Sequence, residues 1–581
     1  MALPSSSRTT VAFCLSILIP AQPTLAQSRR PAAPAKPSPV SSALTDPIDP
    51  RLNQGPKTVA TGDKGMVSTQ LVASTDAALK VLKDGGNAVD AALTAMFVQQ
   101  VHDYHMVFLY GSMSALYYDA KTGKTHAIVA IGQHPDPDRS PGGKTGEVVI
   151  GGTVRGAAAL SKRFGSKPWA SLVEPAIKEA EDGAIVTSYM YGFNFGLWET
   201  GLLGDLRTNA EARRFYMPDG HLVGAGQRWK MPALANTLRE VAKDPDYMYT
   251  GAWGKKFVDA VKKAGMAVTA EDLAEYQPEW TDPTRFTYRG HELLASPPPD
   301  TGGLTIGFNL NVLENFDLKA MGSYMTAPDT LEVMTRTMAR TSEETMGAIR
   351  DPLSFDVPAG LWLDKGYGKM VAEFVKHTQP KVSLAAKTAE AAAFDAPRAA
   401  VIGPDTGSDH IVVADSQGNW ISMLHTIHGG APGIFIDGVR ATGSGLPAPS
   451  RGPGRRLILP ISAVMAMKDG KPWLAMGTPG NPPQPVTEVL VNILDFDMAP
   501  NDAAEMPRFW AVNEGHGVKL QYESRLSGAV MQRIRARGLG LEDLGAYNYH
   551  TGSMQIVWRD PATGKLMGST DQRRLGNAQG Y

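Results

Sequence analysis

The chain has 581 residues, too many for a single hydrophobic core, and 43% of them are hydrophobic while 20% are charged. This is the composition of an ordinary globular protein. The formal net charge of −1 argues against a nucleic-acid-binding protein, because phosphate binding depends on a surplus of lysine and arginine.

The first 26 residues predict a signal peptide. Arg8 supplies the positive flank, residues 11–21 form a short apolar core, and Ala26 ends a small-residue cleavage site. That core is too short to span a membrane as a mature helix. Residues 27–56 are rich in Pro, Ala and Ser, which predicts an extended linker. We therefore expect a periplasmic or secreted protein without a stable membrane anchor.

The only cysteine, Cys14, lies inside the predicted signal peptide. The mature protein would then have no disulfide, no thiol nucleophile and no thiolate metal site. His102 and His105 could suggest a metal pair, but no convincing third ligand is evident. We expect neither a metal nor a cofactor.

Helices and strands alternate in blocks along the first 350 residues. Ser74 or Thr75 is expected to cap the first helix and Asn87 the second. Strands are expected at residues 113–118, 126–131 and 288–295, and further helices at 151–164, 168–183, 231–242, 253–264, 304–314 and 328–345. Helices packed beside an antiparallel meander indicate an α+β layered fold.

Residues 376–404 lack periodicity and are rich in Ala, Pro and Lys, which indicates an exposed connection where chain cutting is tolerated. Strands dominate after it. Residues 408–427 predict a β-hairpin with its turn at 416–419. Further strands are expected at residues 433–437, 457–468, 472–476, 554–558 and 566–569, and a helix at 486–494.

Ser408 stands at the mouth of the predicted hairpin. A hydroxyl group is a poor nucleophile without an adjacent base. A free α-amino group, with a pKa of about 7.7–8.0, can be that base, and cutting between Gly407 and Ser408 would create one. Local sequence alone favours an ordinary turn serine at this position, and Thr406 is a reserve nucleophile.

Several segments, in chain order, resemble the gamma-glutamyltranspeptidase family of N-terminal nucleophile hydrolases. They are GGNAVDAA at 85–92, FG and PW at 164–169, EPAI at 174–177, SPPPDTGG at 296–303, SDHIVVADSQGN at 408–419, MGTPG at 476–480, LDF at 494–496 and PRF at 507–509. The resemblance implies a four-layer αββα sandwich. It also implies a precursor cut into a large subunit, residues 57–407, and a small subunit, residues 408–581.

The resemblance also implies site residues. The family's nucleophile is a threonine two residues before a histidine, and that position is Ser408, two before His410. A supporting threonine falls on Thr426 without a gap. The backbone N–H groups of Gly480 and Asn481 correspond to the oxyanion donors, which stabilise developing charge.

The chain departs from the family pattern where a charged amino acid is bound. The family segment with a carboxylate-binding arginine is replaced here by a segment that contains His134 and no arginine. A family serine pair is replaced by Leu459 and Pro460, and a family asparagine is replaced by His428. The family's acidic residue for the substrate amine falls near position 441 or 442, where there is none. We expect a less polar pocket, with His428, His134 and Arg440 as candidate substrate contacts.

These observations predict a self-processing amide hydrolase or acyltransferase that acts on a small amide or peptide-like substrate through an acyl-enzyme on Ser408. A standard γ-glutamyl compound is not the expected substrate. Two alternatives stay open: a true γ-glutamyl transferase or glutathione hydrolase with a rebuilt pocket, and an uncleaved, inactive homologue that acts as a binding protein.

Overall fold

The computed structural model describes residues 55–192, 206–207, 209–377, 407–441, 455–480, 483–514 and 517–581. The predicted signal peptide, nearly all of the predicted linker, most of the connection predicted at 376–404, Thr406 and Asn481 lie outside these residues. No helix in the described ranges combines the length and apolar character that crossing a membrane requires.

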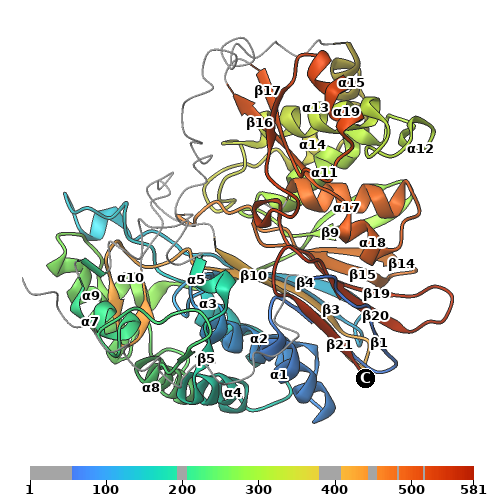
Figure 1. Ribbon diagram of the computed structural model, residues 1–581. Helices are drawn as coiled ribbons and strands as arrows, with labels where there is room; N and C mark the ends of the chain where they lie inside the picture. Colours follow the sequence, from blue (N-terminus) through green and yellow to red (C-terminus); the bar gives the residue numbers. More distant parts are fainter. Residues whose placement is uncertain are drawn as a thin grey trace, which may run out of the picture. The chain divides into compact units, whose positions relative to one another are not determined.

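Two seven-stranded sheets form the centre of the fold (Figure 1). The sheet that carries Ser408 has the order β21 (Asn577–Gly580), β2 (Met66–Thr69), β10 (Ser408–Ala414), β11 (Trp420–Thr426), β3 (Ser112–Asp119), β4 (Lys124–Ala130) and β7 (Glu279–Thr281). The second sheet has the order β1 (Ala60–Gly62), β20 (Leu566–Thr570), β19 (Gln555–Arg559), β15 (Lys471–Gly477), β14 (Val464–Lys468), β9 (His291–Ala295) and β8 (Thr284–Tyr288). All pairs in both sheets are antiparallel.

Three buried apolar clusters define four layers. Residues such as Val412 and Trp420 of the first sheet and Met465 of the second form a core between the sheets. The first sheet packs on its other face against helices, chiefly α1 (Val72–Lys83), α2 (Ala88–His102), α3 (Thr153–Phe164), α4 (Trp169–Asp182), α8 (Pro232–Lys243) and α9 (Ala252–Lys263). The second packs against α11 (Gly302–Leu313), α13 (Pro328–Thr345), α14 (Ala359–Leu363), α15 (Lys365–His377), α17 (Pro483–Leu494) and α19 (Gly528–Ala536). The predicted αββα sandwich is therefore confirmed.

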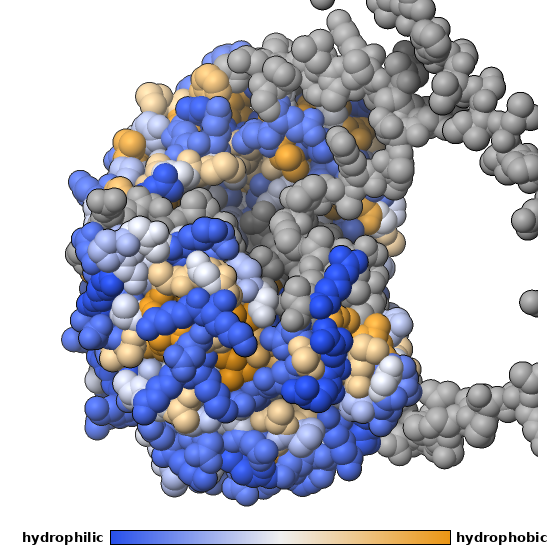
Figure 2. Space-filling model, turned by 90° about the vertical axis from the view of Figure 1, so that its left-hand side faces the viewer, coloured by the Kyte–Doolittle hydropathy of each residue, from blue (hydrophilic) through white to orange (hydrophobic). Residues whose placement is uncertain are grey.

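Shorter elements connect these layers. They are α5 (Ser188–Gly192), α7 (Ala210–Tyr216), α10 (Ala270–Glu275), α12 (Leu318–Met321) and α18 (Pro500–Glu505), with small sheets made by β5 (Ala184–Ile185) and β6 (Arg228–Trp229), by β12 (Phe435–Ile436) and β13 (Val439–Arg440), and by β16 (Phe509–Glu514), β17 (Gly517–Tyr522) and β18 (Gly540–Asp543). Figure 2 shows polar residues over most of one face, with smaller apolar areas between them.

Local signals explain some of the helix starts. Asn87 caps α2 in a reciprocal capping box with Asp90. Pro328 occupies the first turn of α13, where its missing N–H does no harm. The predicted caps of α1 are wrong: the helix begins one residue after Leu71, and the hydroxyls of Ser74 and Thr75 donate to the Leu71 carbonyl from inside the first turn.

Two predicted strands are shorter than expected. The strand expected at 288–295 is the turn and second strand of a β8–β9 hairpin, because Arg289 and Gly290 both have positive φ. Of residues 457–468, only β14 is a strand. The preceding residues bond to the loop that carries the three prolines: the Thr301 N–H donates to the Leu459 carbonyl.

Candidate active site

Ser408 is the first residue of β10, at the mouth of a regular hairpin. Its Cα lies opposite Thr426 in the β10–β11 ladder. Side chains alternate along a strand, and Val412 and Ala414 of β10 belong to the core between the sheets. The Ser408 side chain therefore lies on the face directed toward the second sheet.

The carbonyl oxygen of Gly407 accepts hydrogen bonds from two groups on β11 and its extension. The Thr426 hydroxyl donates to it, and so does the Ile427 N–H at 3.4 Å. A Cβ added to Gly407 would lie 2.8 Å from the Met106 Cα, so only glycine fits here. Donors on a carbonyl oxygen stabilise the negative charge that develops when a nucleophile attacks its carbon. The Ser408 hydroxyl is on the residue directly attached to that carbon.

His410 lies two residues further along the same face. Its Nε2 is 3.0 Å from the Ser422 Oγ, which also donates to the Met476 carbonyl. Burial lowers the pKa of His410 to about 3. The imidazole is therefore neutral at physiological pH and suited to packing and hydrogen bonding.

The predicted oxyanion loop follows β15. Gly477, the last residue of β15, packs against the His410 ring, which brings the loop to the same end of the sheets as Ser408. The Thr478 hydroxyl donates to the Pro479 carbonyl at 2.9 Å and accepts from the Ser553 N–H at 2.6 Å. Gly480 has a φ of +89°, a conformation that favours glycine.

His425 and His428, which the sequence places near the hairpin, lie in different surroundings from His410. His425 Nε2 lies 2.8 Å from the Gln99 amide oxygen, on the helix-facing side of the sheet. Burial lowers the pKa of His425 to about 3 and that of His428 to about 4. Ser112 donates to the His428 carbonyl at 2.6 Å.

The two histidines weighed as a metal pair have different partners. His102 Nε2 lies 2.9 Å from a Glu179 carboxylate oxygen, and His105 Nδ1 lies 3.4 Å from an Asp103 oxygen. Within the described ranges no group of three or more His, Cys, Asp or Glu side chains is arranged to hold a metal ion.

The remaining predicted substrate contacts are buried. His134 Nδ1 lies 2.9 Å from the Val148 carbonyl oxygen, and Arg455 donates to the His134 carbonyl at 3.0 Å. The Arg440 guanidinium lies 5.5 Å from the centre of the Phe108 ring. Their role toward substrate stays a prediction.

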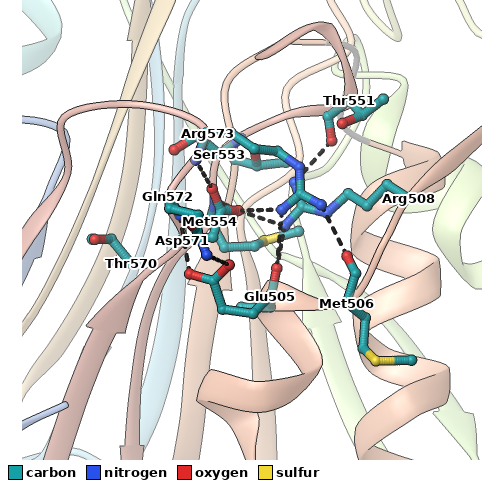
Figure 3. A network of polar contacts seen from close by, with 12 residues as sticks. Glu505, Met506, Arg508, Thr551, Ser553, Met554, Thr570, Asp571, Gln572 and Arg573 are labelled. Atoms are coloured by element: carbon teal, nitrogen blue, oxygen red, sulfur yellow. Dashed lines mark hydrogen bonds and ion pairs between the residues drawn. The ribbon is translucent and has the colours of Figure 1, made fainter. Parts of the chain in front are cut away.

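Sequence reasoning missed the C-terminal arginine that contacts Ser408. Arg574 Nη1 donates to the Ser408 carbonyl at 2.9 Å, and the Arg574 side chain is buried. Arg573 and Asp571, its neighbours, belong to the polar network of Figure 3, in which Arg508 donates to Asp571 at 2.6 Å. The Arg573-Arg574 pair was visible in the sequence, but nothing local connects it to a residue 166 positions earlier.

Comparisons with known proteins give the class first. The cephalosporin acylase of Bacillus halodurans matches 94% of this chain and 99% of its own with a TM-score of 0.74 at 24% identity, so the two share a fold. Acylase ACY 1 proenzyme of Pseudomonas sp. (strain SE83) is 28% identical over 83% of this chain and 88% of its own length. Glutathione hydrolase proenzyme of Escherichia coli is 26% identical over 88% of this chain and 91% of its own length. The fold and these relatives define an enzyme of the N-terminal nucleophile hydrolase class.

The family model of gamma-glutamyltranspeptidase matches residues 74–581. The chain belongs to the gamma-glutamyltranspeptidase family.

Proposed function

We propose that the protein cuts its own chain between Gly407 and Ser408 and then acts as an amide hydrolase or acyltransferase. The carrying observation is the pair of hydrogen bonds that Thr426 and Ile427 donate to the Gly407 carbonyl, beside the hydroxyl-bearing residue. Attack of the Ser408 Oγ on that carbon breaks the Gly407–Ser408 C–N bond, and the hydroxyl proton passes to the freed nitrogen. The resulting ester is then hydrolysed by water. The products are a fragment that contains the linker and the large subunit, residues 57–407, and the small subunit, residues 408–581.

The freed amino group of Ser408 is the base in our proposal. It takes the hydroxyl proton while Oγ bonds to the substrate carbonyl carbon, and it gives the proton to the departing amine. Water repeats the attack on the resulting acyl-enzyme and releases the acid. The N–H groups of Gly480 and Asn481 are the proposed donors to the substrate oxyanion.

The substrate in our proposal carries a less polar acyl group than γ-glutamyl. Two observations support this choice: relatives are named acylases, and Leu459 is buried in an apolar cluster with Val129 and Ile131. Relatives named glutathione hydrolases favour the second candidate, a γ-glutamyl enzyme. Turnover of γ-glutamyl and fatty-acyl p-nitroanilides, with glutathione as competitor, separates the two. Efficient release from the γ-glutamyl compound would overturn our choice.

Replacement of Ser408 tests self-processing directly. Wild-type protein is expected to give two bands on a denaturing gel, with Ser408 at one N-terminus by sequencing. Ser408→Ala removes the hydroxyl and should give a single band and no turnover, whereas the matched control Thr406→Ala should be cut normally. A single wild-type band would support the uncleaved binding protein instead.

We also propose export with removal of the first 26 residues. The same sequencing experiment should then find Gln27 at the N-terminus of the large-subunit fragment. A fragment that keeps Met1 in exported protein would contradict this.

A further inference from the structure

The guanidinium of Arg574 is buried directly behind the nucleophile residue. Its Nη1 donates to the Ser408 carbonyl at 2.9 Å and lies 3.9 Å from an Asp409 carboxylate oxygen. Arg574 is 2% exposed and Asp409 is fully buried. A buried guanidinium is stable only with nearby negative charge or carbonyl oxygens, and these two residues supply both.

Three further groups surround this pair. The carboxyl of Asp103, the residue that follows α2, lies beside Asp409. The His105 Nδ1 lies 3.4 Å from an Asp103 carboxylate oxygen. The Tyr189 ring is 6.0 Å from the guanidinium. Burial raises the pKa of Asp103 to about 6, and burial together with Asp103 raises that of Asp409 well above its usual range. One carboxylate charge shared by this pair is enough to balance Arg574.

Chain cleavage changes what holds Ser408. Before cleavage, Ser408 is fixed through its peptide bond to Gly407, whose carbonyl accepts from Thr426 and Ile427. After cleavage those two hydrogen bonds hold only the new C-terminus of the large subunit. The hydrogen bond from Arg574 acts on the carbonyl of Ser408 itself and therefore persists. Without such a bond, the first residue of a strand frays.

We propose that Arg574 is a positioning residue that fixes the backbone of Ser408 after cleavage, and that Asp409 holds the guanidinium in place. The proposal rests on the self-processing function above. A displacement of the reacting atoms by about 1 Å costs roughly 10²-fold in rate, so this one contact can decide turnover.

Arg574→Lys tests the proposal. Lysine keeps the charge, but it has no planar group that can reach both the Ser408 carbonyl oxygen and the Asp409 carboxylate oxygen. The probe is p-nitrophenyl acetate, an activated ester that reports on the nucleophile. Cleavage should still go to completion on a denaturing gel, while kcat falls about 10²-fold and KM changes little. The control Arg559→Lys, at an exposed arginine of β19, should match wild type in all three measurements.

Asp409→Asn is the second variant. It keeps nearly the same shape but removes the carboxyl group that lies 3.9 Å from the guanidinium, and it leaves Asp103 as the remaining carboxyl of the pair. We expect complete cleavage and a fall in kcat of about tenfold. An unchanged kcat in either folded, cleaved variant overturns the proposal. Loss of cleavage and turnover together in a folded variant also overturns it, because it would place the role in the precursor. Failure of wild-type protein to cut itself would instead overturn the proposed function.

Discussion

Asp300 shows how one side chain depends on its tertiary surroundings. It follows the three prolines of the loop before α11 and is fully buried, and neither carboxylate oxygen has a hydrogen-bond partner within the described residues. Burial raises the pKa of Asp300 well above its usual range, although the positive charge of Arg456 acts in the opposite direction. In the sequence, this aspartate is an ordinary turn residue.

Removing this carboxyl group should stabilise the protein at high pH. A raised pKa means that the folded state keeps a proton that the unfolded state loses above a pH of about 3.9, so stability falls as pH rises, by roughly 1.4 kcal/mol per pH unit, until the folded pKa is reached. Asp300→Asn should therefore melt higher than wild type, by more at pH 8 than at pH 5. The exposed control Asp356→Asn should show no such trend in thermal unfolding. A gain that is equal at both pH values would contradict the assignment.

At the scale of elements, the hairpin of Ser408 was predicted well and the irregular segment before β14 was not. The hairpin is encoded locally, by alternating apolar residues and a turn at Ser416–Asn419. The backbone of residues 457–463 is satisfied by partners far away: the Ser296 N–H donates to the Ala463 carbonyl, and the Ala463 N–H donates to the Ser296 hydroxyl. Period-two patterning cannot reveal that exchange.

The contact between β15 and β10 makes Gly477 intolerant of a side chain. A Cβ there would lie 2.3 Å from the His410 Nε2. Gly477→Ala should displace the imidazole from Ser422 and cost about 1–3 kcal/mol, as overpacking does. Thermal unfolding checks this against Gly528→Ala, where a Cβ meets nothing within 4 Å. Equal melting temperatures for the two variants would show that the ring has room to move.

At the scale of the molecule, strands from the two ends of the described chain form one edge of each seven-stranded sheet. β1 pairs with β20 in one sheet, and β21 pairs with β2 in the other. The loop between β20 and β21 is fixed by buried polar contacts. Arg573 donates to both oxygens of Glu523 at 2.7 Å and lies 3.3 Å from Asp571, the residue that Figure 3 shows beside it. This places Arg574, the next residue, against Ser408.

Replacing Arg573 should destabilise the whole fold. Arg573→Met removes one guanidinium partner from the buried carboxylates of Glu523 and Asp571, which costs about 3–5 kcal/mol. Burial acts to raise the pKa values of Glu523 and Asp571, but Arg573 and Arg508 bring both below their usual range. Their stabilisation is present above the unfolded pKa of about 4 and is lost as pH falls through the folded values. The melting-temperature difference from wild type should therefore be large at pH 7 and shrink below about pH 4.

A matched variant separates this effect from a general loss of positive charge. Arg559→Met removes an exposed arginine of β19 and should change stability by less than about 0.5 kcal/mol. A pH-independent difference between Arg573→Met and wild type would contradict the role given to the two carboxylates.

The sequence by itself determined most of the long helices, the hairpin that begins at Ser408 and, through ordered motifs, the family and the layered fold. These features are set by periodicity, capping and turn residues that lie close together along the chain. Only the tertiary structure decided that Thr426 and Ile427 hold the Gly407 carbonyl, and that Arg574 holds that of Ser408. Both contacts join segments that are distant in the chain, and they exist because the sheets pack together and bury polar groups that must then find partners.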